Sequence, residues 1–402
     1  MPSSERSQLI RAIERERGTR VISYITSTRP GLEVQMSMEV IRIIYDHLLL
    51  ITRDEPQPKI DLFLHSNGGD GTVPWRLVTL IREYASEFNV LVPFRAFSAA
   101  TLTCLGAAHV VMHPMAMLGP TDPTVSGPFN PPNPFNQAER IGISVEDVGA
   151  YIALVKEDVG ITHEDELVQA FNILANNVHP LALGNVKRII SQSRMLARKL
   201  LGLHMNITED HLIDEIVDKL TSKLFYHGHP INRDEARDQI GLATIEKPTD
   251  KVADLMWALY LDYEQEIQMH EPFNFVEEYL ENPLKQPVPV GAAALHNYDI
   301  ETGCGDILPT NMPAQNTSAN SYLLTPPTRV PLAFIESASR TDTSMFAYQL
   351  SGLLQPTGET TVVVIQRGTK WEEGRREKAA LTPFSSSSLP STTNFPAMSL
   401  LD

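Results

Sequence analysis

The sequence is poor in basic residues and in cysteine. Its 402 residues include 33 Lys and Arg against 49 Asp and Glu, which gives a formal net charge of −16. This balance argues against nucleic-acid binding and against docking on anionic lipid, because both need a basic surface. The only two cysteines, Cys104 and Cys304, form no CxxC pair and no His/Cys cluster at zinc spacing. They are typical of buried free thiols in a reducing compartment, and the sequence predicts neither a metal nor a cofactor.

The chain also lacks an apolar segment suited to targeting or anchoring. Residues 1–18 are rich in Ser, Arg and Glu and contain no apolar core of a signal peptide. The longest apolar run, residues 97–118, contains His109, His113 and Pro114, which a membrane span tolerates poorly. We therefore interpret this run as a buried helix followed by buried strands, and we predict a cytoplasmic protein without an integral membrane segment.

Predicted strands and helices alternate along the first third of the chain. The strands expected at residues 20–25, 60–64 and 89–94 are short and apolar, without the polar alternation of a half-exposed sheet. Amphipathic helices are expected between them, at residues 37–50 and 72–88. The pattern predicts the α/β class, with a mostly parallel sheet covered by helices on both faces. A proline-rich loop follows, and beyond it helices are predicted almost throughout to residue 269.

Composition divides the chain into five parts. Seven prolines and little periodicity mark residues 282–327 as a linker or arm, and Ser, Pro and Thr dominate from residue 385 onward. Two strand-like runs, at residues 330–335 and 360–366, lie between these segments. We expect a helical lead at 1–19, a main α/β domain with helical additions at 20–275, a Pro-rich linker or arm at 276–329, a small C-terminal β-containing unit at 330–384 and a disordered tail at 385–402.

A glycine-rich turn and a serine follow two neighbouring predicted strands. The turn contains Gly68 and Gly69 and matches neither a Walker loop nor GxGxxG, but its glycines allow backbone N–H groups to face an oxyanion. Ser98 comes at the end of the next strand and the start of a helix, where negative charge is favoured. In a parallel sheet both positions fall at the same carboxyl edge, where α/β sites form. Taken singly, the two features also fit a tight turn and a helix N-cap.

Three segments, in order and at fitting spacing, resemble one protein family. They are Leu62-Phe63-Leu64-His65-Ser66-Asn67-Gly68-Gly69-Asp70, Phe97-Ser98-Ala99-Ala100-Thr101 and Met117-Leu118-Gly119-Pro120-Thr121-Asp122-Pro123. They are similar to the serine dehydrogenase proteinase family, which belongs to the Clp-fold serine proteases and is akin to signal peptide peptidase A. Further matches at residues 178–184 and 226–231 extend the resemblance over residues 20–242. The family usually has Ser-Ala-Gly-Thr, so Ala100 is a departure beside the expected oxyanion site.

The resemblance implies a Clp/crotonase-like β-α superhelix with Ser98 as nucleophile and N–H groups of Gly68 and Gly69 as oxyanion hole. Clp protease subunits use a His as base, but the corresponding part of this chain has none. Signal peptide peptidase A uses a downstream helical Lys, and that similarity points to Lys156 at the edge of an apolar helix stripe. Lys187 and His227 are the alternative bases, and a solvated surface lysine is the competing interpretation of Lys156.

These features predict a serine peptidase that acts on a protein or peptide substrate. Because Clp-fold proteins generally form rings, the resemblance also implies a homo-oligomer. One alternative is a catalytically inactive Clp-like scaffold or binding protein, which the altered Ala100 and the uncertain base would fit. A minor alternative is a crotonase-type acyl-CoA enzyme, since an oxyanion hole suits a thioester enolate, but no adenine-binding pattern or catalytic Glu pair is evident.

Overall fold

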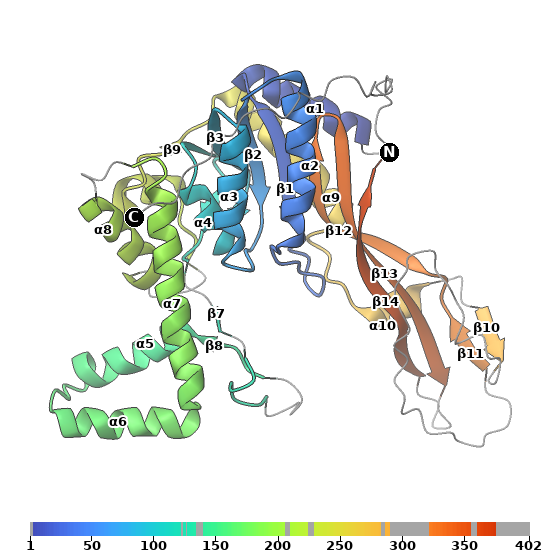
Figure 1. Cartoon of the computed structure of the whole chain (residues 1–402). Coiled ribbons are helices and arrows are strands. Elements are labelled where there is room, and N and C mark those ends of the chain that lie inside the picture. Colours follow the sequence, from blue (N-terminus) through green and yellow to red (C-terminus); the bar gives the residue numbers. More distant parts are fainter. Residues whose placement is uncertain are drawn as a thin grey trace, which may run out of the picture.

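A ten-stranded sheet forms the centre of the molecule (Figure 1). Its strands lie in the order β10-β11-β13-β12-β1-β2-β3-β5-β9, with β14 added on β13. Strands β1, β2, β3, β5 and β9 pair in parallel, and β12, β13, β11, β10 and β14 pair antiparallel. The predicted α/β class is therefore confirmed. The computed structural model describes residues 3–121, 124–125, 127–133, 140–205, 210–223, 229–282, 286–289, 321–354 and 360–374.

The parallel strands are short and apolar, as expected for strands buried on both faces. Side chains alternate between the two faces, so that Ile22 and Tyr24 enter one core and Val21 and Ile25 enter the other. The strands of the sheet are β1 (Arg20–Thr26), β2 (Lys59–His65), β3 (Glu87–Val92), β5 (His109–Met112), β9 (Ile245–Glu246), β10 (Gln286–Pro289), β11 (Ser321–Leu324), β12 (Thr328–Ser337), β13 (Arg340–Leu354) and β14 (Thr360–Glu373). Two-stranded pairs are formed by β4 (Arg95–Ala96) with β6 (Met117–Leu118) and by β7 (Thr124–Val125) with β8 (Ile143–Ser144).

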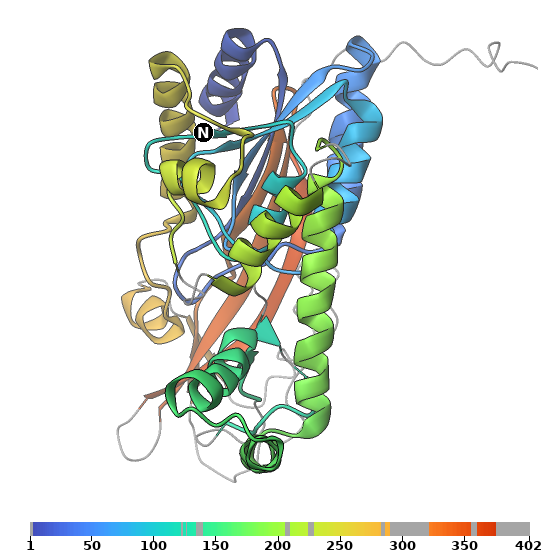
Figure 2. The ribbon, with the colours of Figure 1, turned by 90° about the vertical axis from the view of Figure 1, so that its left-hand side faces the viewer.

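Helices cover both faces of the parallel strands, as Figure 2 shows. On one face lie α2 (Glu39–Asp54), α3 (Val73–Tyr84), α4 (Ala99–Leu105), the C-terminal half of α7 (Pro180–Leu201) and α8 (Asp210–Asp218). On the other lie α1 (Ser3–Arg17) and α9 (Asp250–Ile267). The remaining helical elements are α5 (Val145–Ala153), η1 (Leu154–Asp158), α6 (Glu164–Asn177), η3 (Lys219–Lys223), η4 (Glu235–Ile240) and α10 (Phe275–Glu281).

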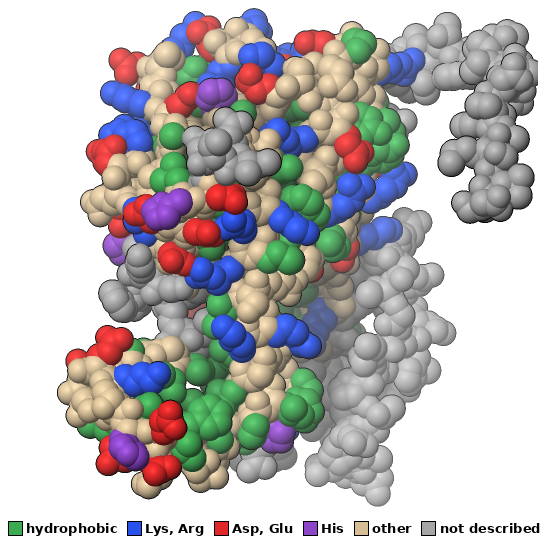
Figure 3. All heavy atoms as spheres, turned by 60° about the vertical axis from the view of Figure 1, so that its left-hand side comes forward, with side chains coloured by type: hydrophobic (Ala, Val, Ile, Leu, Met, Phe, Trp, Pro, Cys, Tyr) green, Lys and Arg blue, Asp and Glu red, His purple; other side chains and the backbone are tan. Residues whose placement is uncertain are grey.

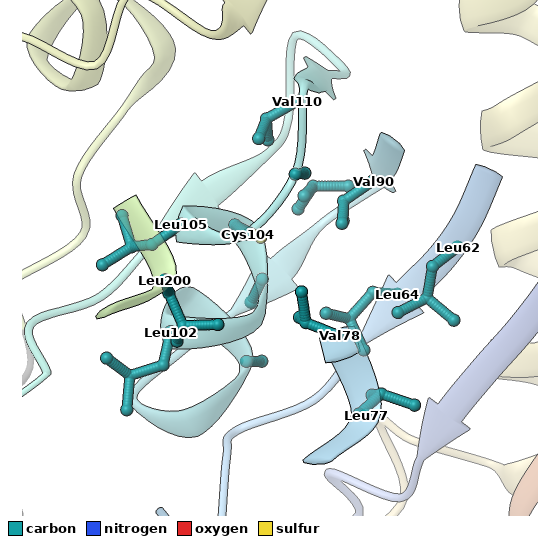
Figure 4. Packing of buried hydrophobic residues seen from close by; sticks show 14 of the residues in the cluster. Leu62, Leu64, Leu77, Val78, Val90, Leu102, Cys104, Leu105, Val110 and Leu200 are labelled. Atoms are coloured by element: carbon teal, nitrogen blue, oxygen red, sulfur yellow. The ribbon is translucent and has the colours of Figure 1, made fainter. Parts of the chain in front are cut away.

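The apolar run at residues 97–118 lies inside this structure. It folds as α4, β5 and β6, which confirms its interpretation as a buried helix followed by strands. Leu102, Cys104 and Leu105 of α4 pack between the sheet and α7 (Figure 4). Cys104 is a buried free thiol, and Cys304 lies outside the described residues. In the described part of the chain, no helix combines the length and the apolar character needed to cross a bilayer.

A helical projection lies next to the short pair of strands β7 and β8. It comprises α5, η1, α6 and the N-terminal half of α7, which extend away from the sheet in both ribbon views (Figures 1 and 2). Its core is small, formed by Ile143, Ala182 and Val186. Large apolar side chains of α6 are exposed, among them Val168 and Ile173, and Figure 3 shows hydrophobic side chains gathered on this projection.

The C-terminal strands continue the main sheet. From the sequence we expected residues 330–384 to form a small unit of their own. In the structure, β12 pairs antiparallel with β1, so these strands are hydrogen-bonded to the parallel half of the sheet. The strand-like runs at 330–335 and 360–366 lie in β12 and β14, but each pairs with β13 rather than with the other. The long strands β13 and β14 extend beyond the parallel strands and pack against α10.

A buried cluster of polar side chains connects the hairpin of β12 and β13 to α2 through hydrogen bonds. His47 of α2 is fully buried, with its Nδ1 2.8 Å from Ser337 Oγ and its Nε2 3.0 Å from Asp342 Oδ2. Asp342 also accepts hydrogen bonds from the guanidinium of Arg340, which is 7% exposed. Burial would raise the pKa of Asp342, but hydrogen bonds from Arg340 and His47 outweigh it and lower that pKa. The carboxylate is thus held ionised between two donors.

The Asp342→Asn variant is expected to lose about 1–3 kcal/mol of unfolding free energy at pH 7, because Arg340 loses its hydrogen-bonded carboxylate and keeps only Asp46 and Glu373, at 3.7 and 3.9 Å. Since the folded pKa lies below the unfolded value of about 3.9, this stabilisation is present above that value and is lost as pH falls through the folded pKa. Urea unfolding at several pH values measures both effects. The variant should lose less stability than the wild type below about pH 4, and the exposed Asp165→Asn variant serves as the control. Parallel acid profiles for the wild type and Asp342→Asn would contradict this assignment.

Candidate active site

The glycine turn after β2 packs directly against Ser98. Gly68 has a φ of +97°, and a Cβ atom added there would lie 2.7 Å from Phe97 O and 2.9 Å from Ser98 Cβ. Only glycine fits so close an approach of two backbone segments at positive φ. Two hydrogen bonds hold the segments together, from Ser66 N–H to Arg95 O and from Phe97 N–H to Ser66 O, each 3.0 Å long. The structure therefore brings the turn and Ser98 together at the edge where the sequence predicted them.

Ser98 has an unusual backbone conformation. It precedes α4 with φ 51° and ψ −112°, a region that non-glycine residues rarely adopt. Strain of this kind persists only where the surrounding structure enforces it, and it concentrates at functional sites. The side chain is half-buried and makes no hydrogen bond to the described residues. The hydroxyl is thus held at the sheet edge without an internal partner.

Two backbone N–H groups in the segments around Gly68 and Ser98 have no hydrogen-bond partner among the described residues. Gly68 N–H, one of the expected donors, instead donates to Ser66 Oγ at 3.0 Å. Gly69 bridges Met36 in parallel fashion through the hydrogen bonds of its flanking residues, so its own N–H points away from Met36. Neither Gly69 N–H nor Ala99 N–H has a partner within the described residues. Ala99 was not among the donors predicted from the sequence, although its position directly after Ser98 would have indicated it.

Ala100, the departure from the family pattern, lies in the core. It is fully buried in the cluster between the sheet and its helices, and its N–H donates to Phe97 O at 2.9 Å. A Cβ atom added at Gly68 would meet Phe97, Ser98 and the backbone of Ala99 first, and not Ala100. The extra methyl group is therefore accommodated in the apolar core rather than between Gly68 and Ser98.

The structure does not bring the expected Lys156 to Ser98 within one subunit. Lys156 is exposed on η1, in the helical projection. The preceding helix packs through Val148 on Val186 of α7, whereas α4 packs on Leu200 of the same helix. At about 1.5 Å per residue, Val186 and Leu200 are about 21 Å apart along α7.

The other described basic residues in this part of the chain do not contact Ser98 either. Lys187 is exposed on the N-terminal half of α7, and His227 lies outside the described residues. His113 faces α9, where its ring stacks on Trp257 at 4.9 Å and its Nδ1 accepts a hydrogen bond from Met115 N–H. Among the residues that the structure describes, no basic side chain forms a hydrogen bond with Ser98.

A protein-family model matches the part of the chain that contains Ser98. Residues 2–153 match the model of the ClpP-like SDH-type serine proteinases, which confirms the resemblance predicted from the three segments. This match includes Gly68, Gly69 and Ser98 and ends before Lys156.

Two uncharacterized proteins of Methanocaldococcus jannaschii are similar in sequence. One is 32% identical over 131 residues, which are 30% of this chain and 42% of that protein. The other is 31% identical over 103 residues, which are 25% of this chain and 36% of that protein. The chain thus spans less than half the length of these curated relatives. Among solved structures, a mutant of the 1510-N membrane-bound stomatin-specific protease aligns over 59% of this chain and 83% of its own, with 14% identity and a TM-score of 0.34.

Proposed function

We propose that this protein is a serine peptidase with Ser98 as its nucleophile. The close packing of Gly68 against a strained Ser98 is the observation that carries the proposal. Ser98 Oγ would attack the carbonyl carbon of a peptide bond and give its proton to a base, and the carbonyl oxygen would become the oxyanion. Gly69 N–H and Ala99 N–H would stabilise that charge. The protonated base would then supply the proton that the leaving amine needs.

We infer further that Lys156 is the base and that a second copy of the chain supplies it. Lys156 and Ser98 are widely separated within one subunit, so only another subunit of an assembly could carry this lysine to the site. The exposed apolar side chains beside it, Leu154 and Val159, would be covered in such an assembly. This proposal makes the protein a homo-oligomer whose sites form between subunits, acting on peptide or protein substrates in the cytoplasm.

Incubation with a library of peptides from a digested proteome tests the proposed activity. We expect the wild-type protein to generate new peptide termini, detected by mass spectrometry, and a fluorophosphonate probe to label the peptide that contains Ser98. Reaction of both kinds needs an activated serine, whereas an unactivated hydroxyl is a weak nucleophile. The Ser98→Ala protein is the control for contaminating peptidases. Equal numbers of new termini with wild type and variant would refute the proposal.

An inactive Clp-like scaffold is the second candidate. It is favoured by one observation, that Ser98 has no basic partner among the described residues of its own subunit. A scaffold would assemble like the enzyme but would neither cleave the library nor react with the probe. The same experiment therefore separates the two candidates.

A further inference from the structure

Two buried nitrogen atoms in the segments that lead to Gly68 and Ser98 have no hydrogen-bond partner among the described residues. They are Nε2 of His65, at the end of β2, and Nε of Arg95, in β4. His65 is fully buried and Arg95 is partly buried. Buried polar groups in folded proteins are nearly always paired, so unpaired ones indicate a ligand or ordered water.

A hydrogen bond at Nδ1 determines which nitrogen of the His65 ring carries the proton. Nδ1 accepts from the backbone N–H of Arg95 at 3.3 Å, so the neutral ring carries its proton on Nε2. Burial, and then the nearby charge of Arg95, lower the pKa of His65 to about 3. The ring is therefore neutral at physiological pH, and its unpaired Nε2–H is a donor, like the N–H groups of Arg95.

Aromatic rings pack around these donors. The His65 ring lies parallel to Phe94 at 6.0 Å between centroids, and the Cζ of Arg95 lies 4.8 Å from the same Phe94 ring. Tyr260 of α9 lies 5.0 Å from His65. Glu264 of α9 is paired with His270 at 2.9 Å and also interacts with the Tyr260 hydroxyl, whose pKa is raised by burial and by this interaction. Among the described residues no carboxylate forms an ion pair with Arg95.

The backbone of Arg95 lies close to that of Ser98. The segment from Arg95 to Phe97 lies beside the glycine turn, because Arg95 O and Phe97 N–H form hydrogen bonds with the backbone of Ser66. Ser98 follows directly. At about 3.3 Å per extended residue, the backbone of Arg95 is at most about 10 Å from that of Ser98. An extended peptide with its scissile bond at Ser98 would span that distance with about three residues.

We propose that His65 and Arg95 form a subsite that binds a carboxylate of the substrate. Two donors without acceptors among packed aromatic rings match a carboxylate, and a guanidinium binds its two oxygens in parallel. The carboxylate would be either the C-terminus of the peptide or the side chain of an Asp or Glu. The inference rests on the proposed peptidase function, which supplies the peptide, and it adds Arg95 as a specificity-determining residue.

Binding to the Ser98→Ala protein tests the subsite without turnover. Three pools of N-acetylated tetrapeptides of neutral residues are titrated by calorimetry: one with a free C-terminal carboxylate, one amidated, and one amidated with a single internal Glu. We expect one carboxylate pool to bind at least about tenfold more tightly than the neutral amidated pool, as charged hydrogen bonds do. Adding Arg95→Met should remove that difference, and Arg95→Lys should retain part of it because the charge remains.

The Arg76→Met variant is the matched control. It removes the same charge from an exposed position on α3, and the preference should survive. Circular dichroism confirms that each variant is folded. A preference for the first pool identifies a C-terminal carboxylate, and one for the third pool identifies an acidic side chain. Equal or absent binding of all three pools, or a preference that persists in Arg95→Met, would overturn the subsite. If the peptidase proposal is wrong but the subsite exists, the wild-type protein will bind a carboxylate pool and cleave no peptide.

Discussion

Replacing Ser98 by alanine is expected to reduce kcat/KM for peptide hydrolysis by at least about 10³-fold, because only oxyanion stabilisation and substrate binding remain without the nucleophile. The fold should be retained. The hydroxyl makes no hydrogen bond to the described residues, and the positive φ is enforced by the backbone around it. The measurements are steady-state kinetics on a peptide chosen from the library and thermal unfolding, with a midpoint expected within a few degrees of the wild type.

A second serine variant shows whether the loss is specific. Ser86→Ala changes an exposed serine between α3 and β3, and its activity should stay within about twofold of the wild type. Retention of more than about a tenth of the wild-type activity by Ser98→Ala would remove Ser98 from the nucleophile's role. A strong drop in the unfolding midpoint would instead indicate that Ser98 is needed for structure.

The meeting of the glycine turn with Ser98 could be predicted because it depends on local order. Parallel strands place their carboxyl ends at one edge, so two motifs that follow adjacent strands must lie close together. The assignment of individual donors could not be predicted in the same way. It depends on the side chain of Ser66, which takes the N–H of Gly68 and leaves Gly69 and Ala99 available.

The pairing of strands that are distant in the sequence could not be predicted for a different reason. The antiparallel register of β12 with β1, such as Ile25 opposite Phe334, joins segments separated by most of the chain. No periodicity in either segment specifies the partner, since a buried strand reads as a plain apolar run. The amphipathic pattern around Lys156 likewise predicted a helix, but not that the helix leaves the sheet. Placement of a helix depends on the partners of its apolar face, here Ala182 and Val186 on α7.

Replacing Lys156 by alanine is expected to reduce peptide hydrolysis about 10³-fold, since an unassisted serine hydroxyl is a poor nucleophile at neutral pH. Lys187→Ala is the matched control on the same projection and should leave activity within about twofold. If Lys187→Ala or His227→Ala abolishes hydrolysis while Lys156→Ala does not, the base is one of these alternatives. Kinetics on purified variants of equal oligomeric state, checked by sedimentation, decide between them.

Co-expression of the two inactive chains tests whether the lysine acts between subunits. A chain with Ser98→Ala keeps Lys156, and a chain with Lys156→Ala keeps Ser98, so neither chain has a complete pair. If one subunit supplies the base to the next, a randomly mixed assembly has about one quarter of its sites complete. Mixed assemblies isolated with two different tags should then recover about a quarter of the wild-type activity, whereas each variant alone stays inactive. If the base acted within its own subunit, mixing would restore no activity. Each subunit would still lack either Ser98 or Lys156.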